Sequence, residues 1–332
     1  MHGTQGPTEL SALSAVGPSH RKALRHVTVV MPALNEAEAV GPTIREVKRA
    51  FEATGLPVEI EVVVVDGKSR DSTVEVARAE GARVIIQKST GYGDALYSAF
   101  VYSSNELRTD IICTMDADGS YDPMSLVEGV SRLMDDKFDL VMGARVIEGE
   151  AMTATNRFGN KVITWMVRRI LGVEVSDSQS GMFIFWASLV ENIQPKMRGW
   201  AFNTEILTRA LESEYRIGEI RSRYKKRIGN RKLPVATAGL ANLSAILRMT
   251  RDSRPLLFHG TISAALLVSA LVLGVRTILT SSLLLAILTA LLALIGLQVL
   301  IFGLVADMIK DVRTSQMKKP LPYKTTDNAS ER

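Results

Sequence analysis

Two long apolar stretches near the C-terminal end constrain the fold of this chain more than any other feature. Residues 256–275 and 278–306 contain no Asp, Glu, Lys or Arg. A helix of about 20 apolar residues crosses a hydrocarbon core of roughly 30 Å. A buried helix of a soluble protein rarely stays apolar on every face for that length. We therefore expect two transmembrane helices within residues 256–306, and the alternative is a buried helical hairpin.

Basic residues on both sides of these stretches predict the orientation in the membrane. Three precede the first stretch and four follow the second, namely Arg248, Arg251, Arg254, Lys310, Arg313, Lys318 and Lys319. The short connection between the stretches holds only Arg276. The positive-inside rule then puts both flanks on the cytoplasmic side of the membrane. We therefore expect a multi-pass membrane protein whose preceding domain and polar tail 307–332 lie in the cytoplasm. Apolar and basic residues alternate at helical spacing in 235–255, which predicts an interfacial juxtamembrane helix.

Composition and the N-terminal residues narrow the class of protein further. The net charge of +5 suits a nucleic acid, an anionic membrane or a phosphorylated substrate. A single cysteine, Cys113, excludes a disulfide scaffold and a cysteine-built metal site. Residues 1–25 lack the apolar core of a cleaved signal peptide and are expected to form a flexible arm. We expect Cys113 to be inert core, and Trp165 to serve packing.

Residues 26–150 alternate between strand and helix patterns, within a domain that we expect to span residues 26–234. Short apolar runs predict five strands, over residues 27–31, 60–65, 84–86, 111–115 and 140–144. Helical spacing of apolar residues fills most of the intervals between them. This alternation predicts an α/β domain with a mostly parallel sheet. Ligands of such sheets bind beyond the carboxyl ends of the strands, so polar residues directly after a strand are site candidates.

The segment after the fourth predicted strand carries two carboxylates, Asp116 and Asp118. Two acids one residue apart at a strand end can share one hard cation, and Mg²⁺ or Mn²⁺ binds few protein oxygens when substrate phosphates complete its shell. The alternative for this pair is helix capping or a solvated turn.

Polar segments also follow the first and second predicted strands. Residues 32–36 and 66–69 supply acidic and amide groups that can bond a base edge and a ribose hydroxyl, and the alternative is a pair of ordinary turns. Gly91 and Gly93 would let the backbone approach a ligand closely. The glycine patterns of dinucleotide-binding folds and of P-loops are missing from the sequence, which disfavours both functions.

These segments resemble a known family. The first set, in order, is PALNE (32–36), VVDGKS (64–69), GYGDAL (91–96) and MDADGSYDP (115–123). The set is similar to the GT-A (Rossmann-like) domain of glycosyltransferase family two. Further segments are GAR (143–145), NR and GN (156–160), DSQSG (177–181), WAFNTE (200–205) and YKKRIGNRKL (224–233). The longer set resembles polyprenyl-phosphate hexose synthases, the dolichyl-phosphate mannose and glucose synthases, over residues 27–235, with the membrane hairpin as a common appendage.

The resemblance implies a role for each motif. The nucleotide would contact Pro32, Leu34, Glu36, Asp66 and Asp116. Mg²⁺ or Mn²⁺ would be bound by Asp116 and Asp118. The lipid phosphate and the leaving diphosphate would be held by Arg145, Arg157 and Arg227, with Lys232 beside them. Asp118 and the three arginines would form the catalytic set.

Two departures from the family pattern concern individual contacts. Ser120 is the candidate third metal ligand, at a position where mannose-type synthases often have a glutamine in that role. Gly67 stands where many relatives have a second acid. The segments RGWAFNTE and DSQSG are closer to glucose-type synthases, which favours a UDP-glucose or UDP-N-acetylglucosamine type of donor, with GDP-mannose as the alternative.

The chemistry of the acceptor gives an argument that does not depend on the family. An alcohol needs a general base, whereas a phosphate monoester is largely a dianion at neutral pH and needs only orientation and charge compensation. Arginine forks provide both. A downstream basic set next to membrane spans therefore predicts a polyprenyl or dolichyl phosphate acceptor, and a single in-line attack would invert the anomeric centre.

Three alternatives accompany this hypothesis. The basic residues of 221–232 could instead bind anionic headgroups. A family-two enzyme acting on a hydroxyl of a lipid or glycan would need a base, for which Asp177 and Glu205 are candidates. A non-catalytic membrane assembly module is the third. Nucleic acid is excluded as a partner because the basic set lacks interleaved aromatic residues and lies shortly before the spans.

Overall fold

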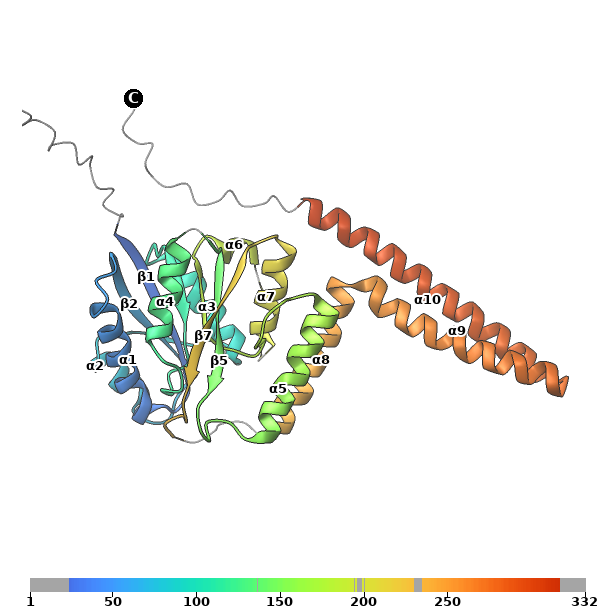
Figure 1. Cartoon of the computed structure of the whole chain (residues 1–332), viewed down its shortest axis with the longest axis horizontal. Coiled ribbons are helices and arrows are strands. Elements are labelled where there is room, and N and C mark those ends of the chain that lie inside the picture. The colour runs from blue at the N-terminus through green and yellow to red at the C-terminus, as the bar shows by residue number, and fades with distance from the viewer. Residues whose placement is uncertain are drawn as a thin grey trace, which may run out of the picture.

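The computed structural model describes residues 24–135, 137–193, 195, 199, 201–229 and 235–316. The chain forms an α/β domain from which a long helical hairpin projects (Figure 1). The predicted N-terminal arm lies outside the described residues except for Leu24 and Arg25, and Arg25 already belongs to the first strand.

The described part of the domain is built on a seven-stranded sheet with the order β3-β2-β1-β4-β6-β5-β7. The strands are β1 (Arg25–Ala33), β2 (Val58–Asp66), β3 (Arg83–Ile86), β4 (Ile111–Thr114), β5 (Leu140–Ile147), β6 (Phe183–Trp186) and β7 (Ile217–Tyr224). All neighbouring pairs are parallel except those of β6, which runs antiparallel to β4 and β5. The mostly parallel sheet predicted from the apolar runs is confirmed.

Helices cover both faces of this sheet. They are α1 (Ala37–Glu52), α2 (Thr73–Ala79), α3 (Tyr92–Asn105), α4 (Met124–Met134), α5 (Ala154–Met166), the π-helical η1 (Val167–Leu171), α6 (Leu189–Ile193) and α7 (Phe202–Glu212). Ile184 of β6 lies against Gly129 of α4, and Phe185 packs on Phe100 of α3. Because successive strand residues point to opposite faces, α3 and α4 lie on opposite sides of the sheet.

A buried threonine sets the point at which the reversed strand begins. Thr114, the last residue of β4, pairs with Phe183 in the antiparallel register. Its hydroxyl donates to the carbonyl of Gly181 at 2.6 Å and accepts from the N–H of Phe183 at 2.9 Å. Since β6 is antiparallel to β4, its first residues and the loop before them lie at the carboxyl end of β4.

Three further helices complete the described chain: α8 (Val235–Ser253), α9 (Pro255–Thr280) and α10 (Leu283–Gln316). The bounds of α8 agree with the juxtamembrane helix expected over 235–255. In Figure 1, α8 lies beside α5 at the edge of the domain, and α9 and α10 extend from there as a packed pair.

The α9–α10 hairpin has the length and composition of two membrane spans. Spans Pro255–Thr280 and Leu283–Val312 have mean hydropathies of 2.2 and 2.7, and only 11% and 6% of their most apolar windows are buried in the protein. This exposure rules out a hairpin buried within the domain. The turn lies at Ser281–Ser282, later than the expected connection near Arg276, and α10 continues past Ala306 into the segment expected to be a polar tail. Helical hydrogen bonding can carry through both positions because α9 has no proline after Pro255 and α10 has none.

Candidate active site

The loops after β1 and β2 are joined to each other by hydrogen bonds. The N–H of Gly67 donates to the carbonyl of Ala33 at 2.8 Å, and the N–H of Asn35 donates to the hydroxyl of Ser69 at 2.8 Å. Asn35 has a positive φ of 52° and accepts from the N–H of Arg70 at 2.7 Å through its side chain. These contacts hold the two predicted nucleotide-binding segments as one surface at the carboxyl edge of the sheet.

Asp66 ends β2 and is fully buried in this surface. Its Oδ2 accepts the N–H groups of Lys68 and Ser69, at 2.9 and 3.0 Å. Its Oδ1 is buried and has no hydrogen-bond partner within the described part of the chain. An orphaned carboxylate oxygen costs free energy unless a ligand supplies a donor, so Asp66 fits a residue that binds an N–H or O–H group. Pro32 is half-buried in β1, and Leu34 is exposed beside Gly67.

The acidic pair follows β4, as the sequence predicts. Burial and the neighbouring charge of Asp118 raise the pKa of Asp116 well above its usual value. Asp118 is buried, and its Oδ1 accepts from the N–H and the hydroxyl of Ser120 at 3.0 and 2.6 Å. A divalent cation stabilises two carboxylates whose charges repel each other, so Asp116 and Asp118 fit Mg²⁺ or Mn²⁺. The hydroxyl of Ser120 donates to Asp118 and orients it. This hydrogen bond makes Ser120 a weaker candidate for the third metal ligand.

No group of three or more His, Cys, Asp or Glu side chains with metal-binding geometry occurs among the described residues. Asp116 and Asp118 would therefore leave most of the coordination shell to other oxygens. This is the usual arrangement where a cation binds through one or two carboxylates and the phosphates of its substrate.

Arg227, from the segment after β7, lies between two of the strand-end loops. Its Nη2 is 2.7 Å from Oε1 of Glu36 and 3.3 Å from Oδ2 of Asp118. The N–H of Ile228 also donates to the carbonyl of Asp118 at 2.9 Å. The guanidinium thus compensates part of the negative charge of the site and joins the proposed nucleotide and metal positions. Its Nε is buried without a partner among the described residues, which leaves a donor for a ligand oxygen.

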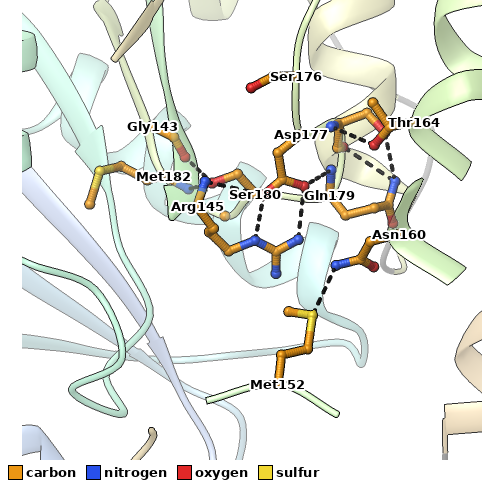
Figure 2. Close-up of polar contacts among 12 residues, drawn as sticks. Gly143, Arg145, Met152, Asn160, Thr164, Ser176, Asp177, Gln179, Ser180 and Met182 are labelled. Atoms are coloured by element: carbon orange, nitrogen blue, oxygen red, sulfur yellow. Dashed lines mark hydrogen bonds and ion pairs between the residues drawn. The ribbon is translucent and has the colours of Figure 1, made fainter. Parts of the chain in front are cut away.

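Arg145 of β5 is held by Asp177, as Figure 2 shows. Its Nε and Nη2 bond the two carboxylate oxygens at 2.6 and 2.9 Å, and its guanidinium lies over the ring of Tyr224 at 5.3 Å. Burial alone would lower the pKa of Arg145, but the charge of Asp177 outweighs it and raises the pKa. Arg145 therefore stays charged, and its field stabilises the ionised form of nearby Asp116.

Residues beside Asp116 that the sequence hypothesis did not assign also belong to this site. A Cβ on Gly181 would lie 2.8 Å from the hydroxyl of Tyr92 and 3.3 Å from Oδ1 of Asp116. Tyr92 is hydrogen-bonded to Asn203, and the N–H of Gly181 donates to the hydroxyl of Tyr121 at 2.8 Å. Glycine is required here because a side chain would fill the space next to Asp116. The sequence singles out the GYGD, DSQSG and WAFNTE segments as motifs. It does not show that Tyr92, Gly181 and Asn203, one from each segment, lie together beside Asp116.

The remaining predicted arginine is not joined to this cluster by any contact among the described residues. Arg157, in the first turns of α5, is exposed and donates to the carbonyls of Met152 and Gly149 at 3.1 and 2.6 Å. None of the contacts recorded for the described residues joins it to Arg145 or Arg227. Lys232 lies outside the described residues.

Fold and site together define a class of protein. A GT-A α/β domain with an acidic pair after β4 is the architecture of glycosyltransferases. The family model for glycosyl transferase family 2 matches residues 28–193, and the chain belongs to this family.

Two relatives from Haloferax volcanii resemble the chain over much of its length. A dolichyl-phosphate hexose transferase is 32% identical over 233 residues, covering 69% of this chain and 95% of the relative. Glycosyltransferase AglJ is 26% identical over 306 residues, covering 88% and 96%. The second alignment is long enough to include part of the helical hairpin.

A solved structure has the same fold. Glucosyl-3-phosphoglycerate synthase from Mycobacterium tuberculosis, in complex with Mn²⁺, UDP and glucosyl-3-phosphoglycerate, aligns with a TM-score of 0.53 at 22% identity, covering 68% of this chain and 80% of that one. Another complex of the same enzyme contains Mg²⁺ and UDP. This likeness confirms the GT-A architecture.

Proposed function

We propose that the protein transfers a hexose, with inversion, from a nucleoside diphosphate sugar to a polyprenyl or dolichyl phosphate in the membrane. The product would be a lipid-phosphate-linked β-sugar for glycan assembly. A UDP-glucose or UDP-N-acetylglucosamine type of donor is favoured, and GDP-mannose is the alternative. The named activity of the Haloferax dolichyl-phosphate hexose transferase and the apolar hairpin support this proposal.

The donor nucleotide would bind at the carboxyl ends of β1 and β2. Oδ1 of Asp66 lacks a partner among the described residues and would accept a ring N–H of the base. Pro32, Leu34 and Glu36 would line the base and ribose. Uracil and guanine both present a ring N–H beside carbonyl groups, so Asp66 supports both donor types.

The diphosphate of the donor would lie at the carboxyl end of β4. Asp116 and Asp118 would hold Mg²⁺ or Mn²⁺ there, and the cation, when bound, neutralises charge on the departing diphosphate. Arg227 would contribute a second positive charge, since it already lies 3.3 Å from Asp118. The related fold that binds Mn²⁺ or Mg²⁺ with UDP supports this assignment.

The hydrogen bonding of the two candidate bases, Asp177 and Glu205, is the observation that most supports a phosphate acceptor. Asp177 is bonded to the guanidinium of Arg145, and Glu205 is buried and bonded to Nε of Arg209 at 2.8 Å. A hydroxyl acceptor would have to compete with these arginines, because both carboxylates already accept hydrogen bonds from guanidinium groups within the domain. A dianionic phosphate needs no base and would be oriented by the arginines of the site.

The acceptor would approach from the membrane. Arg145 and Arg227 would compensate its phosphate, with Arg157 and Lys232 as further proposed contacts. The hairpin would span the bilayer, and the basic residues on its flanks would keep the catalytic domain in the cytoplasm.

A transfer assay with a matched pair of acceptors tests the proposal. The purified full chain is incubated with Mg²⁺ or Mn²⁺, a panel of sugar nucleotides, and either a short-chain polyprenyl phosphate or the corresponding polyprenol. We expect a sugar phosphodiester from the phosphate alone, no product with Asp118→Asn, and retained turnover with Glu205→Gln. Equal modification of the polyprenol, or loss of turnover with Glu205→Gln while donor binding survives, would instead establish a hydroxyl acceptor with a carboxylate base.

A further inference from the structure

We propose that Asn203 recognises the hexose of the donor through its side-chain oxygen, which accepts a hydrogen bond from one sugar hydroxyl, and that Tyr92 positions this side chain. The inference deepens the proposed function, on which it rests, by assigning a contact that selects the sugar. It concerns the donor alone, so it applies equally to a phosphate acceptor and to a hydroxyl acceptor.

Two helices that pack against each other bring these residues together. Tyr92 is the first residue of α3 and Asn203 is the second residue of α7, so each lies at the N-terminal end of its helix. The rings of Phe100 on α3 and Phe202 on α7 pack with their centroids 5.9 Å apart. The packing of α3 on α7 therefore supports the hydrogen bond between Asn203 and the Tyr92 hydroxyl.

The side chain of Asn203 is buried but uses only part of its hydrogen-bonding capacity. Burial raises the pKa of the Tyr92 hydroxyl, and the hydrogen bond with Asn203 opposes this in part, as a bond donated by the amide N–H does. The Oδ1 atom of Asn203 is buried and has no partner among the described residues. A buried carbonyl oxygen without a donor costs free energy, so Oδ1 suits a ligand that brings an O–H or N–H group.

The position of Asn203 matches the sugar of the donor rather than its base. The sheet order places β6 on the side of β4 opposite to β1 and β2, whose loops would bind the nucleotide. Gly181, just before β6, lies between the Tyr92 hydroxyl and Asp116, because its Cβ would be 2.8 Å from the first and 3.3 Å from Oδ1 of the second. Asn203 is thus bonded to a group next to the proposed cation position, on the side away from the base. A hexose linked to the diphosphate at that cation would extend to this side.

The chemistry of Oδ1 identifies a hydroxyl group as its partner. A phosphate dianion has no hydrogen to donate, so the phosphate of the acceptor cannot satisfy this oxygen. A hexose carries several hydroxyl groups, and each can donate. A site built to bond a hydroxyl rejects an analogue that lacks it, because the buried polar group is then left unpaired. Tyr92 contributes to the selection because its bond to Nδ2 determines which end of the amide is left for the ligand.

Calorimetric titration with deoxy sugars tests this inference. UDP-glucose and GDP-mannose are titrated into the native full chain with Mn²⁺, and the one that binds is followed by each of its monodeoxy analogues. We expect one analogue to bind at least about fivefold more weakly than its parent, because its loss of a hydroxyl leaves Oδ1 unpaired. Equal affinity for the parent and for every analogue would overturn the inference without any substitution in the protein.

A variant of Asn203 assigns the discrimination to its side chain. Asn203→Leu removes both polar groups at nearly the same size, and we expect it to bind the parent and the weak analogue alike. Its affinity for the free nucleoside diphosphate with Mn²⁺ should be unchanged. Asn105→Leu, at the exposed far end of α3, is the control and should discriminate as the native chain does. Retained discrimination in Asn203→Leu would show that another residue contacts the hydroxyl, and weaker binding of the free nucleotide with Mn²⁺ would assign the oxygen to the cation. Either result overturns the inference.

Tyr92→Phe tests the positioning role and gives an answer even where Asn203→Leu fails to fold. Without the phenolic oxygen, the amide can turn its N–H groups toward the sugar, so the discrimination between parent and analogue should fall. Affinity for the free nucleotide with Mn²⁺ should stay, which a general structural defect would not allow. In Asn203→Leu, the added Tyr92→Phe change should have no further effect on discrimination. Undiminished discrimination in Tyr92→Phe would overturn the role of Tyr92.

Failure of the proposed function gives different results. If neither sugar nucleotide binds the native chain, the proposed donor and the inference are both overturned. If a sugar nucleotide binds with the expected discrimination but its hexose is not transferred to polyprenyl phosphate, the proposed acceptor is wrong and the inference stands.

Discussion

Replacing Asp177 with Asn should destabilise the domain through Arg145. The two side chains are only 12% and 10% exposed and form a bidentate pair. Removing one member of a buried pair costs about 3–5 kcal/mol, because an uncompensated charge remains. The Asn carbonyl keeps one of the hydrogen bonds to Arg145, so we expect a smaller cost, about 2–3 kcal/mol.

The chain contains a matched control for this substitution. Asp139 and Arg216 form a pair of the same bidentate geometry, with bonds of 3.1 and 3.0 Å, but Arg216 is 57% and Asp139 23% exposed. Exposed pairs contribute about 0–1 kcal/mol, so Asp139→Asn should cost much less than Asp177→Asn.

Thermal unfolding followed by intrinsic fluorescence measures the difference. For a domain of this size, 1 kcal/mol shifts Tm by about 2–4 °C. We therefore expect a loss of about 4–12 °C for Asp177→Asn and of less than about 4 °C for Asp139→Asn. Asp177→Asn should also raise KM for the lipid phosphate more than KM for the donor. Equal shifts of Tm in the two variants would refute the argument that burial sets the strength of the Arg145–Asp177 pair.

Further predictions concern the metal, the glycine beside it and the cysteine. Mn²⁺ with UDP should raise Tm of the native protein and leave Asp118→Asn unchanged, and an equal rise in the variant would place the cation elsewhere. Gly181→Ala should weaken UDP binding at least about fivefold, because its Cβ would meet the Tyr92 hydroxyl and Asp116, an overpacking that costs about 1–3 kcal/mol. Gly159→Ala, where nothing lies within 4 Å of the new Cβ, is the control and should bind UDP as before. Burial raises the pKa of the Cys113 thiol, so less thiolate forms at a given pH, and iodoacetamide at pH 8 should label it only after unfolding. Rapid labelling of the native protein would contradict this.

The sequence predicts the α/β class well because five strands are apolar runs rich in Val and Ile. Two strands escape such a prediction. β6 has four residues, Phe183–Trp186, and gives no periodic signal. β7 alternates buried and exposed positions and includes Arg221 and Arg223, so its composition indicates a basic patch rather than an edge strand. Both strands are specified by pairing with β5, which is distant in the chain.

Some residues of the candidate site can also be predicted from the sequence, and others cannot. Asp66, Asp116 and Asp118 can be located because each follows a recognisable strand in a parallel sheet. The contact between Arg227 and Glu36 joins residues 191 positions apart. Because the pattern of neighbouring residues in the sequence reports only on local structure, it cannot predict this contact. Trp165, expected to pack in the core, is exposed because its helix turns another face toward the domain. Such orientations depend on the packing of whole elements, so they become visible only in the folded chain.

The hydroxyl of Thr114 determines which residue stands opposite the acidic pair. A slip of β6 by one position would bring Ser180 or Met182 in place of Gly181 and reverse the faces of Ile184 and Phe185. The stretch before this anchor is itself bonded to the domain, through Asp177 to Arg145 and through Ser180 to the carbonyl of Gly143. Gly181 and Phe183 are fixed in turn because both are bonded to the Thr114 side chain. We therefore expect a change of loop length between residues 177 and 183 to displace either Arg145 or Gly181 from its place beside Asp116.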